Sequence, residues 1–337
     1  MTRVRANPAP AGVPLVVDVD GTLVKTDLLH ESLMQLIATR PLYALRLPGW
    51  LGQGRATLKR QLAHLVDPHL KTLPLRPEVV ALVREAQAKN RPVYLASASD
   101  HIHVSSLAEQ IGGIAGVFAT DGETNLAGDR KAAALIAAFG PQGFDYIGDR
   151  KVDFPVWAQA RKVLAVTHSS AFERSVKKRF PEAQIIARAR ASGSSLVRAL
   201  RPHQWAKNLL LFLPLIVGHF FDARTIGATA LAFVCFCMAA SSAYILNDIL
   251  DLPGDRVHPG KQRRPFAAGD VSISSGLLCS ALLFVGAAAV SLLLPWGFTA
   301  LLGLYVLTTL AYSLVLKRKL FVDVITLPFG KSYTTCL

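Results

Sequence analysis

The spacing of apolar residues changes abruptly near residue 200. Before that point, apolar runs are short and charged residues separate them, whereas afterwards the runs are long and uncharged. Short buried runs between polar segments are typical of an α/β domain, and long uncharged runs are typical of membrane helices. We therefore expect an α/β domain over residues 1–190, a linker and amphipathic lead-in over 191–204, and an all-α transmembrane helix bundle over 205–337.

Three short apolar runs in the first half predict buried strands, at residues 14–17, 92–96 and 144–147. Residues 27–85 separate the first run from the second and carry the periodicity of helices, with Leu29, Leu33 and Leu36 on one face. A helical insertion is therefore expected between the first two strands.

Polar residues with catalytic potential follow each of these runs. The set comprises Asp18, Asp20, Ser97, Ser99, Lys131, Asp149 and Asp153. Two carboxylates spaced two apart on an extended chain point the same way, and Gly21 allows a sharp turn after them. Because functional groups gather at the carboxyl ends of parallel strands, these side chains can meet at one edge of the sheet and hold Mg²⁺.

These residue types suit phosphoryl transfer. A carboxylate can accept a phosphoryl group, and a second carboxyl group can protonate the leaving oxygen and then activate water. Magnesium and a lysine would offset the negative charge, and a hydroxyl would bind a phosphate oxygen. Individually, each Asp could instead cap a turn, but four coincident motifs favour the catalytic interpretation.

The order DxDGT, Ser, Lys and GDxxxD resembles the haloacid dehalogenase-like phosphatases over about residues 12–185. The resemblance implies a Rossmann-like α/β domain with a helical cap at about residues 27–85. It implies that Asp18 is the nucleophile, that Asp20 is the general acid and base, and that Ser97 binds phosphate, with Ser99 as the alternative. It also implies that Lys131 completes the phosphate site.

The same resemblance implies a magnesium site formed by Asp18, the backbone carbonyl of Asp20, and Asp149, with Asp153 in support. The cap carries four cations that could meet an anionic substrate, but solvation at the surface is the favoured interpretation for them. They are Arg46, Arg55, Lys59 and Arg60. The substrate is a phosphorylated small molecule or a lipid-linked sugar phosphate, and the sequence does not choose between them.

The second half predicts about four membrane spans. Residues 226–246 and 271–316 lack charged residues and are long enough for one and two spans, whereas residues 205–221 are a weaker candidate. Basic residues concentrate before the first span, after the second and after the fourth. By the positive-inside rule these segments lie in the cytoplasm, so we expect a multi-pass protein of the inner (plasma) membrane with a cytoplasmic N-terminal domain.

A cluster of polar residues follows the second predicted span. Its members are Asn247, Asp248, Asp251 and Asp255, and HPGKQRRP, with Lys261 and Arg264, comes after them. The carboxylates lie three and four residues apart and share one face of a continuing helix. They need a counter-charge, which magnesium bound to a diphosphate supplies, and the basic residues suit the phosphates. Alternatively, the polar loop only caps a span.

NDxxDxxxD followed by HPxKxxRP resembles the UbiA superfamily of intramembrane prenyltransferases. The segment RPHQWAKN, with Lys207, points to the members similar to decaprenyl-phosphate phosphoribosyltransferase. The resemblance implies a magnesium-diphosphate site at the four polar residues, substrate contacts from Lys207, Lys261 and Arg264, and a polyprenyl phosphate or diphosphate as partner. The family has about nine spans, so we expect this chain to be a truncated version with impaired transfer.

Composition supports a membrane protein and excludes a disordered one, because 51% of the residues are hydrophobic and only 18% are charged. The formal net charge is +14, and the basic loops account for much of this excess. The sequence shows no aromatic stacking platform that would suggest nucleic acid as a partner. The favoured hypothesis is a bifunctional enzyme, a Mg²⁺-dependent phosphatase fused to a polyprenyl-dependent transferase. The alternatives are a membrane-tethered phosphatase with a vestigial transferase half and a nonfunctional fragment.

Overall fold

The computed structural model describes residues 12–311, except residue 168 and residues 189–192. Part of the predicted linker and everything after residue 311 lie outside the described residues. The chain divides into two compact units, one formed by Met1–Ser195 with Leu252–Ile273 and the other by Leu196–Asp251 with Ser274–Leu337. Thus a segment from the second half of the sequence is part of the first unit.

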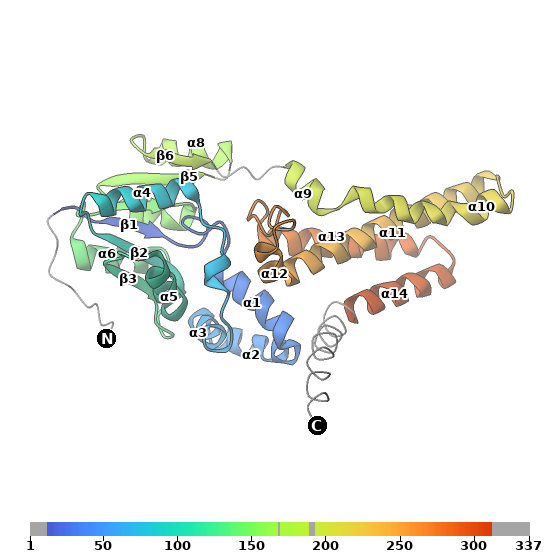
Figure 1. The fold of residues 1–337 in the computed structure, drawn as a ribbon, viewed down its shortest axis with the longest axis horizontal. Coiled ribbons are helices and arrows are strands. Elements are labelled where there is room, and N and C mark those ends of the chain that lie inside the picture. Colours follow the sequence, from blue (N-terminus) through green and yellow to red (C-terminus); the bar gives the residue numbers. More distant parts are fainter. Residues whose placement is uncertain (1–11, 168, 189–192, 312–337) are drawn as a thin grey trace, which may run out of the picture. The chain divides into compact units, whose positions relative to one another are not determined.

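The first unit is built on a six-stranded parallel sheet with the strand order β3-β2-β1-β4-β5-β6 (Figure 1). The strands are β1 (Leu15–Asp18), β2 (Val93–Asp100), β3 (Gly116–Thr120), β4 (Asp145–Gly148), β5 (Lys162–Thr167) and β6 (Gln184–Arg188). All three predicted strands are present, as β1, β2 and β4. The α/β prediction is therefore confirmed, and the strand order reverses direction at β1, where such sheets place their ligands.

Helices cover both faces of this sheet, and alternation along β1 shows why. Leu15 and Val17 point into a core shared with α4 (Pro77–Ala88) and α5 (His101–Ile111). Val16 points into a second core, shared with α6 (Asp129–Phe139), α7 (Phe154–Trp157) and α8 (Ser170–Arg179). Because both faces are buried, β1 is apolar at every position until Asp18.

The predicted helical insertion lies between β1 and β2. It contains α1 (Leu28–Thr39), the 3-10 helix η1 (Pro41–Arg46), α2 (Leu47–Gly52), α3 (Arg55–Leu65) and the 3-10 helix η2 (Leu70–Thr72). Leu36, Leu62 and Val66 form a small core of its own. The predicted range of 27–85 also includes the start of α4, whose Val79 and Val83 pack against the sheet. From here on, "cap" denotes α1 to α3.

The segment Leu252–Ile273 of the first unit begins with the short helix α12 (Leu252–Val257) and continues as turns. Its apolar side chains Leu252, Phe266 and Ile273 are buried. The sequence prediction placed this segment with the membrane region, as a polar loop between spans.

The second unit is helical. Its elements are α9 (Gly193–Ala199), the 3-10 helix η4 (Pro202–Phe212), α10 (Leu213–Val217), α11 (Ala223–Leu250), α13 (Ile273–Ser291) and α14 (Trp296–Ala311). Among the described residues, α11 and α13 are long and apolar enough to cross a membrane, and α14 is a shorter apolar helix. The first predicted span is divided between η4 and α10. The count of four spans therefore remains a prediction.

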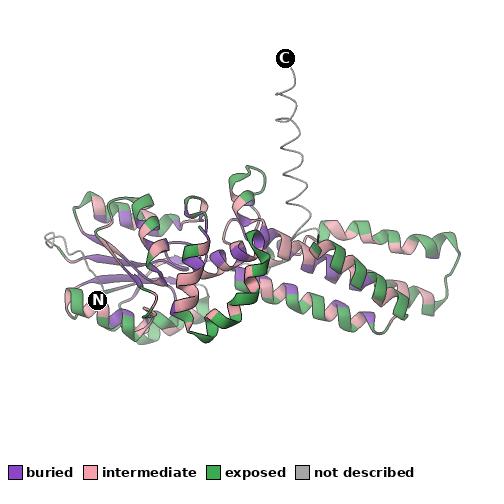
Figure 2. Ribbon diagram, turned by 90° about the horizontal axis from the view of Figure 1, so that it is seen from below, coloured by how far each residue is buried: buried purple, intermediate pink, exposed green. Residues whose placement is uncertain are grey.

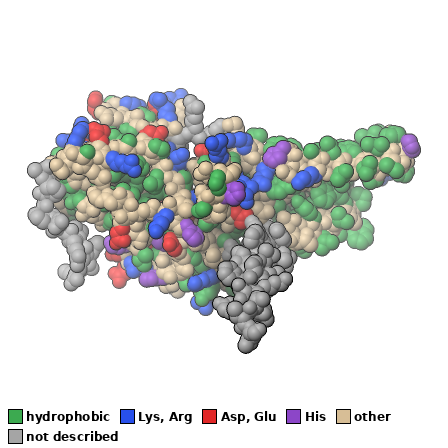
Figure 3. Space-filling model, viewed as in Figure 1, with side chains coloured by type: hydrophobic (Ala, Val, Ile, Leu, Met, Phe, Trp, Pro, Cys, Tyr) green, Lys and Arg blue, Asp and Glu red, His purple; other side chains and the backbone are tan. Residues whose placement is uncertain are grey.

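The helices of the second unit expose many large apolar side chains, including Leu278, Leu282 and Val285 on α13 and Leu304 and Leu307 on α14. Hydrophobic side chains gather over these helices in the space-filling view (Figure 3). In the sheet of the first unit, by contrast, the strands are largely buried (Figure 2). Exposed apolar surface on this scale is unusual in a soluble protein and is expected of helices that face lipid.

Candidate active site

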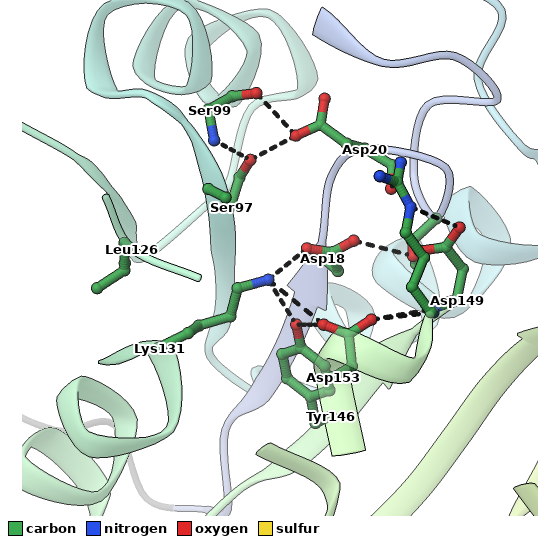
Figure 4. Close-up of polar contacts among 12 residues, drawn as sticks. Asp18, Asp20, Ser97, Ser99, Leu126, Lys131, Tyr146, Asp149 and Asp153 are labelled. Atoms are coloured by element: carbon green, nitrogen blue, oxygen red, sulfur yellow. Dashed lines mark hydrogen bonds and ion pairs between the residues drawn. The ribbon is translucent and has the colours of Figure 1, made fainter. Parts of the chain in front are cut away.

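The candidate residues converge where the strand order reverses. Asp18 ends β1, Ser97 and Ser99 lie in β2, and Asp149 follows β4 (Figure 4). Since β1 pairs with β2 on one side and with β4 on the other, three neighbouring strands deliver these side chains to one place. The predicted convergence at the carboxyl ends of the strands is thus what the structure contains.

Lys131 lies at the centre of this site. It comes from the first turn of α6, and its side chain is only 3% exposed. Its Nζ donates to Asp18 Oδ1 at 2.6 Å and to Tyr146 Oη at 3.0 Å, and it lies 3.5 Å from Asp153 Oδ1. Tyr146 in turn donates to Asp153 Oδ1 at 3.0 Å. The lysine is therefore held in place by side chains from three different elements.

Negative charge exceeds positive charge around Lys131. Carboxylate oxygens of Asp18, Asp149 and Asp153 lie within 4.8 Å of one another, and all three residues are buried. Burial raises the pKa of Asp18 to about 8, although Lys131 counteracts the rise. Burial alone would lower the pKa of Lys131, but Asp18 and Asp153 outweigh it and raise that pKa. The two shifts have different main causes: burial raises the pKa of Asp18, with smaller contributions from Asp153 and Asp149, whereas the neighbouring carboxylates raise the pKa of Lys131.

Asp20 is positioned by three donors. The hydroxyls of Ser97 and Ser99 donate to its Oδ2 at 2.7 and 2.8 Å, and the backbone N–H of Leu28 donates to Oδ1 at 2.8 Å. Burial, with a contribution from Asp27, raises the pKa of Asp20, and the three hydrogen bonds oppose this rise. A raised pKa suits a carboxyl group that must carry a proton near neutral pH.

Arg150 is a site residue that sequence reasoning missed. Its Nη2 donates to the backbone carbonyl of Asp20 at 3.1 Å, and its Nε donates to Asp149 Oδ2 at 3.4 Å. It also lies 3.4 Å from Asp27, the N-cap of α1. Its place directly after Asp149 is the available signal, but the motif GDxxxD leaves the residue after its first Asp unspecified.

The turn after Asp20 requires glycine. Gly21 has φ +81°, and a Cβ there would come within 2.2 Å of Asp149 Oδ2. The close approach brings the backbone carbonyl of Asp20 to the same place as the carboxylate of Asp149. Carboxylate and carbonyl oxygens are the ligands that Mg²⁺ prefers, so these residues fit the predicted metal.

Two of the four cap cations reach the site, contrary to the expectation that they are solvated at the surface. Lys59 Nζ donates to the carbonyl of Ala98 at 2.6 Å and to Asn125 Oδ1 at 2.7 Å, and burial lowers its pKa. Arg60 Nε donates to Asp100 Oδ2 at 2.9 Å. Arg46 and Arg55 are exposed, as expected. Lys59 therefore places a cap cation beside the end of β2.

The second candidate set is arranged differently. In the second unit, Asp248 is buried on α11 and pairs with Arg201, while Asn247 and Asp251 are half-buried at the end of that helix. Lys207 is exposed on η4. In the first unit, Asp255 is buried and accepts a hydrogen bond from Arg264 Nη1 at 2.7 Å, with Lys261 at 3.9 Å. Each of Asp248 and Asp255 thus has an arginine partner.

Comparison with known proteins supports both resemblances. Residues 15–157 match the family model of haloacid dehalogenase-like hydrolases, and residues 210–330 match that of the UbiA prenyltransferase family. The chain therefore joins a haloacid dehalogenase-like domain to a UbiA-like region, as the motifs predicted. Both matched families are families of enzymes.

Curated relatives include the uncharacterized protein y4nM of Sinorhizobium fredii, 34% identical over 93% of this chain and 61% of that protein. Decaprenyl-phosphate phosphoribosyltransferase of Mycolicibacterium smegmatis is 38% identical over 41% of this chain and 45% of that enzyme. The chain thus spans less than two thirds of the length of either relative. A solved structure of a probable phosphoserine phosphatase from Vibrio cholerae matches with 18% identity and a TM-score of 0.38, covering 52% of this chain and 63% of that one.

Proposed function

We propose that the N-terminal domain hydrolyses phosphomonoesters through an aspartyl-phosphate at Asp18. The observation that carries this proposal is the buried pair of Asp18 and Lys131, 2.6 Å apart, beside an Asp20 that two serine hydroxyls hold in place. A nucleophile, a proton donor and a phosphate-binding cation within one buried site match the needs of phosphoryl transfer.

The reaction has two steps. In the first, a carboxylate oxygen of Asp18 forms a bond to phosphorus, the bond from phosphorus to the leaving oxygen breaks, and Asp20 gives that oxygen its proton. In the second, a water molecule gives a proton to Asp20 and attacks phosphorus, which releases phosphate and the Asp18 carboxylate. Ser97, with Ser99 as the alternative, would turn its hydroxyl from Asp20 Oδ2 to donate to a phosphate oxygen, while the other serine keeps its hydrogen bond to Asp20, and Lys131 balances the charge.

Magnesium fits the residues present. Asp18, the backbone carbonyl of Asp20 and Asp149 would hold it, and Asp153 would support them by accepting from the backbone N–H groups of Asp149 and Arg150. When bound, the ion would offset the excess of carboxylate charge and polarise a phosphate oxygen.

The second part of the proposal is group transfer from or to a polyprenyl phosphate by the C-terminal region, as in the family it matches. The Asn247–Asp255 segment would bind magnesium and a diphosphate, and Lys207, Lys261 and Arg264 would contact phosphates. One coupling of the two halves is that the phosphatase removes a phosphate from the transferase product. The alternative is a membrane-tethered phosphatase with a vestigial transferase half.

We place the protein in the inner (plasma) membrane as a multi-pass protein with its N-terminal domain in the cytoplasm. The exposed apolar surface of α13 and α14 and the charge-free composition of these helices support a bilayer as partner. The phosphatase substrate is then a phosphorylated small molecule or a lipid-linked sugar phosphate. No feature suggests nucleic acid.

The test is phosphate release by the full chain in detergent with Mg²⁺, measured over a panel of soluble phosphomonoesters and polyprenyl-linked phosphates. Asp18→Asn should abolish release, by at least about 10³-fold, because an amide cannot act as the nucleophile. Asp67→Asn, an exposed aspartate after α3, is the matched control and should be unchanged. Equal release by the wild type and Asp18→Asn would rule out the proposed mechanism.

A further inference from the structure

Residues 252–273, here called the docking segment, belong to the first unit and contact α1 and the stretch of chain before it. They follow α11 in the sequence, about 60 residues beyond the last strand of the sheet, yet they belong to the same compact unit as the sheet. Three of their large apolar side chains are as buried as those of the domain core, with Leu252 at 1%, Phe266 at 2% and Ile273 at 4% exposure, whereas Val257 is exposed. A loop that only joined two membrane helices would have no need to bury them.

One ion pair fixes this contact. Arg256 on α12 meets Glu31 on α1 with two parallel hydrogen bonds, Nη2 to Oε1 at 2.6 Å and Nη1 to Oε2 at 3.1 Å. Both side chains are 4% exposed. The Nε of Arg256 also donates to the carbonyl of Ala267 in the docking segment, at 3.3 Å. A bidentate geometry with both charges buried specifies one position of the segment on α1.

A second contact lies at the other end of the docking segment. Gly269 has φ +71°, and a Cβ at this position would lie 2.8 Å from the Cβ of Lys25 and 3.1 Å from Pro74. Lys25 lies between Asp20 and α1, and its N–H donates to the carbonyl of Pro74 at 2.9 Å. The docking segment therefore packs closely against the stretch of chain that leads from the catalytic turn to the cap.

Helix α1 connects this contact to the active site. Its first residue, Leu28, donates its backbone N–H to Asp20 Oδ1 at 2.8 Å, and Glu31 lies in the same first turn. The N-cap residue Asp27 also pairs with Arg150, which contacts the carbonyl of Asp20. The residue that Arg256 holds is thus one helical turn from the residue that positions Asp20.

We propose that the docking segment positions α1, and through it Asp20, so that phosphatase turnover of the N-terminal domain depends on a segment from the C-terminal half of the sequence. This inference rests on the proposed phosphatase function. Glu31 and Arg256 are positioning residues and do not touch the substrate. The docking segment also carries Lys261 and Arg264, so the same stretch of chain serves both halves of the protein.

The test uses the full chain in detergent and measures kcat and KM for p-nitrophenyl phosphate with Mg²⁺. Arg256→Gln and Glu31→Gln should each lower kcat about ten- to hundredfold with little change in KM, since misplacement of a reacting group affects the chemical step. The charge exchange Glu31→Arg with Arg256→Glu should restore part of the loss. Arg263→Gln, an exposed arginine of the same segment, is the matched control and should keep wild-type kinetics.

Hydrogen exchange of the first turn of α1 is measured on the same variants. Faster exchange in both single variants, together with lower kcat and recovery in the charge exchange, supports the proposal. Faster exchange with unchanged kcat, or unchanged exchange, overturns it. If the wild type releases no phosphate, the proposed function has failed, and the exchange data still decide whether the segment holds α1.

Discussion

Two groups of aspartates in this protein differ in what surrounds them. In the first group, Asp18 and Asp153 share the buried Lys131, and Asp149, whose carboxylate lies within 4.8 Å of theirs, contacts Arg150, which is 45% exposed. In the aspartate-rich segment, Asp248 pairs with Arg201 and Asp255 with Arg264. The first group has an excess of negative charge, whereas in the second each buried carboxylate has a guanidinium partner.

The difference shows that motif spacing does not determine the electrostatics of a site. Both groups match the spacing of metal-binding carboxylates, but only the first leaves charge for a cation to balance. In the second, a ligand that binds through magnesium must compete with the arginines. The first group lies within the first compact unit, whereas the second group is divided, with Asp248 in the second unit and Asp255 in the first.

The largest effect is expected at Lys131. Lys131→Met removes the cation that Asp18 and Asp153 share, and should lower kcat for phosphate release by about 10²–10³-fold, the range found when one charge-stabilising donor is lost. Lys162→Met, at an exposed lysine that begins β5, should keep wild-type activity. The measurement is initial-rate kinetics with saturating Mg²⁺. Retention of activity in Lys131→Met would contradict the central role of the lysine.

The next effect concerns metal binding. Mg²⁺ should raise the Tm of the first unit by several degrees, because a ligand at 100 times its Kd adds about 2.7 kcal/mol to stability. Asp149→Asn should remove most of this increase, while Asp67→Asn should keep it. Thermal unfolding followed by circular dichroism, with Mg²⁺ against EDTA, makes the comparison. An equal increase in Asp149→Asn would place the ion elsewhere.

A smaller effect is expected in the paired group. Arg264→Gln removes the nearer cation, 2.7 Å from the 3% exposed Asp255, and leaves Lys261 at 3.9 Å. It should lower the free energy of unfolding by about 1–3 kcal/mol, the cost of a buried charge that loses a hydrogen-bond donor. Lys261→Gln should cost less than about 1 kcal/mol, since that lysine is 45% exposed. Denaturant unfolding of both variants distinguishes the two pairs, and equal costs would contradict the assignment.

Much of the site could be predicted because its signals are local. An apolar run ending in DVDGT encodes a strand, a turn and two carboxylates within ten residues, and the order of the motifs places Lys131 near Asp18 across 113 residues. The contacts of Lys59, Arg150 and Arg256 could not be predicted in this way. Each contact depends on where a whole helix or segment packs. A lysine or arginine in the sequence does not reveal whether its long side chain is solvated or buried.

The smallest effect expected is on the pH dependence of stability, to which a buried histidine of the first unit contributes. His103 on α5 is buried, its Nε2 lies 3.2 Å from the carbonyl of Val66, and burial lowers its pKa, although Val66 and Asp100 oppose the shift. A group that is neutral when folded and protonates when unfolded makes stability fall as pH drops below the unfolded pKa of about 6.5.

His30 acts in the opposite direction. Its hydrogen bond to Asp27 raises its pKa, so its contribution is present below about pH 6.5 and is lost as pH rises through the folded value. His103→Gln should therefore flatten the decline in Tm between about pH 7 and 5, whereas His30→Gln should steepen it. Thermal unfolding is followed across this range in EDTA. If His103→Gln keeps the wild-type slope, His103 is not the source of the acid sensitivity. Asp18 does not replace it as the source, because its raised pKa makes the folded state bind a proton and adds stability as pH falls.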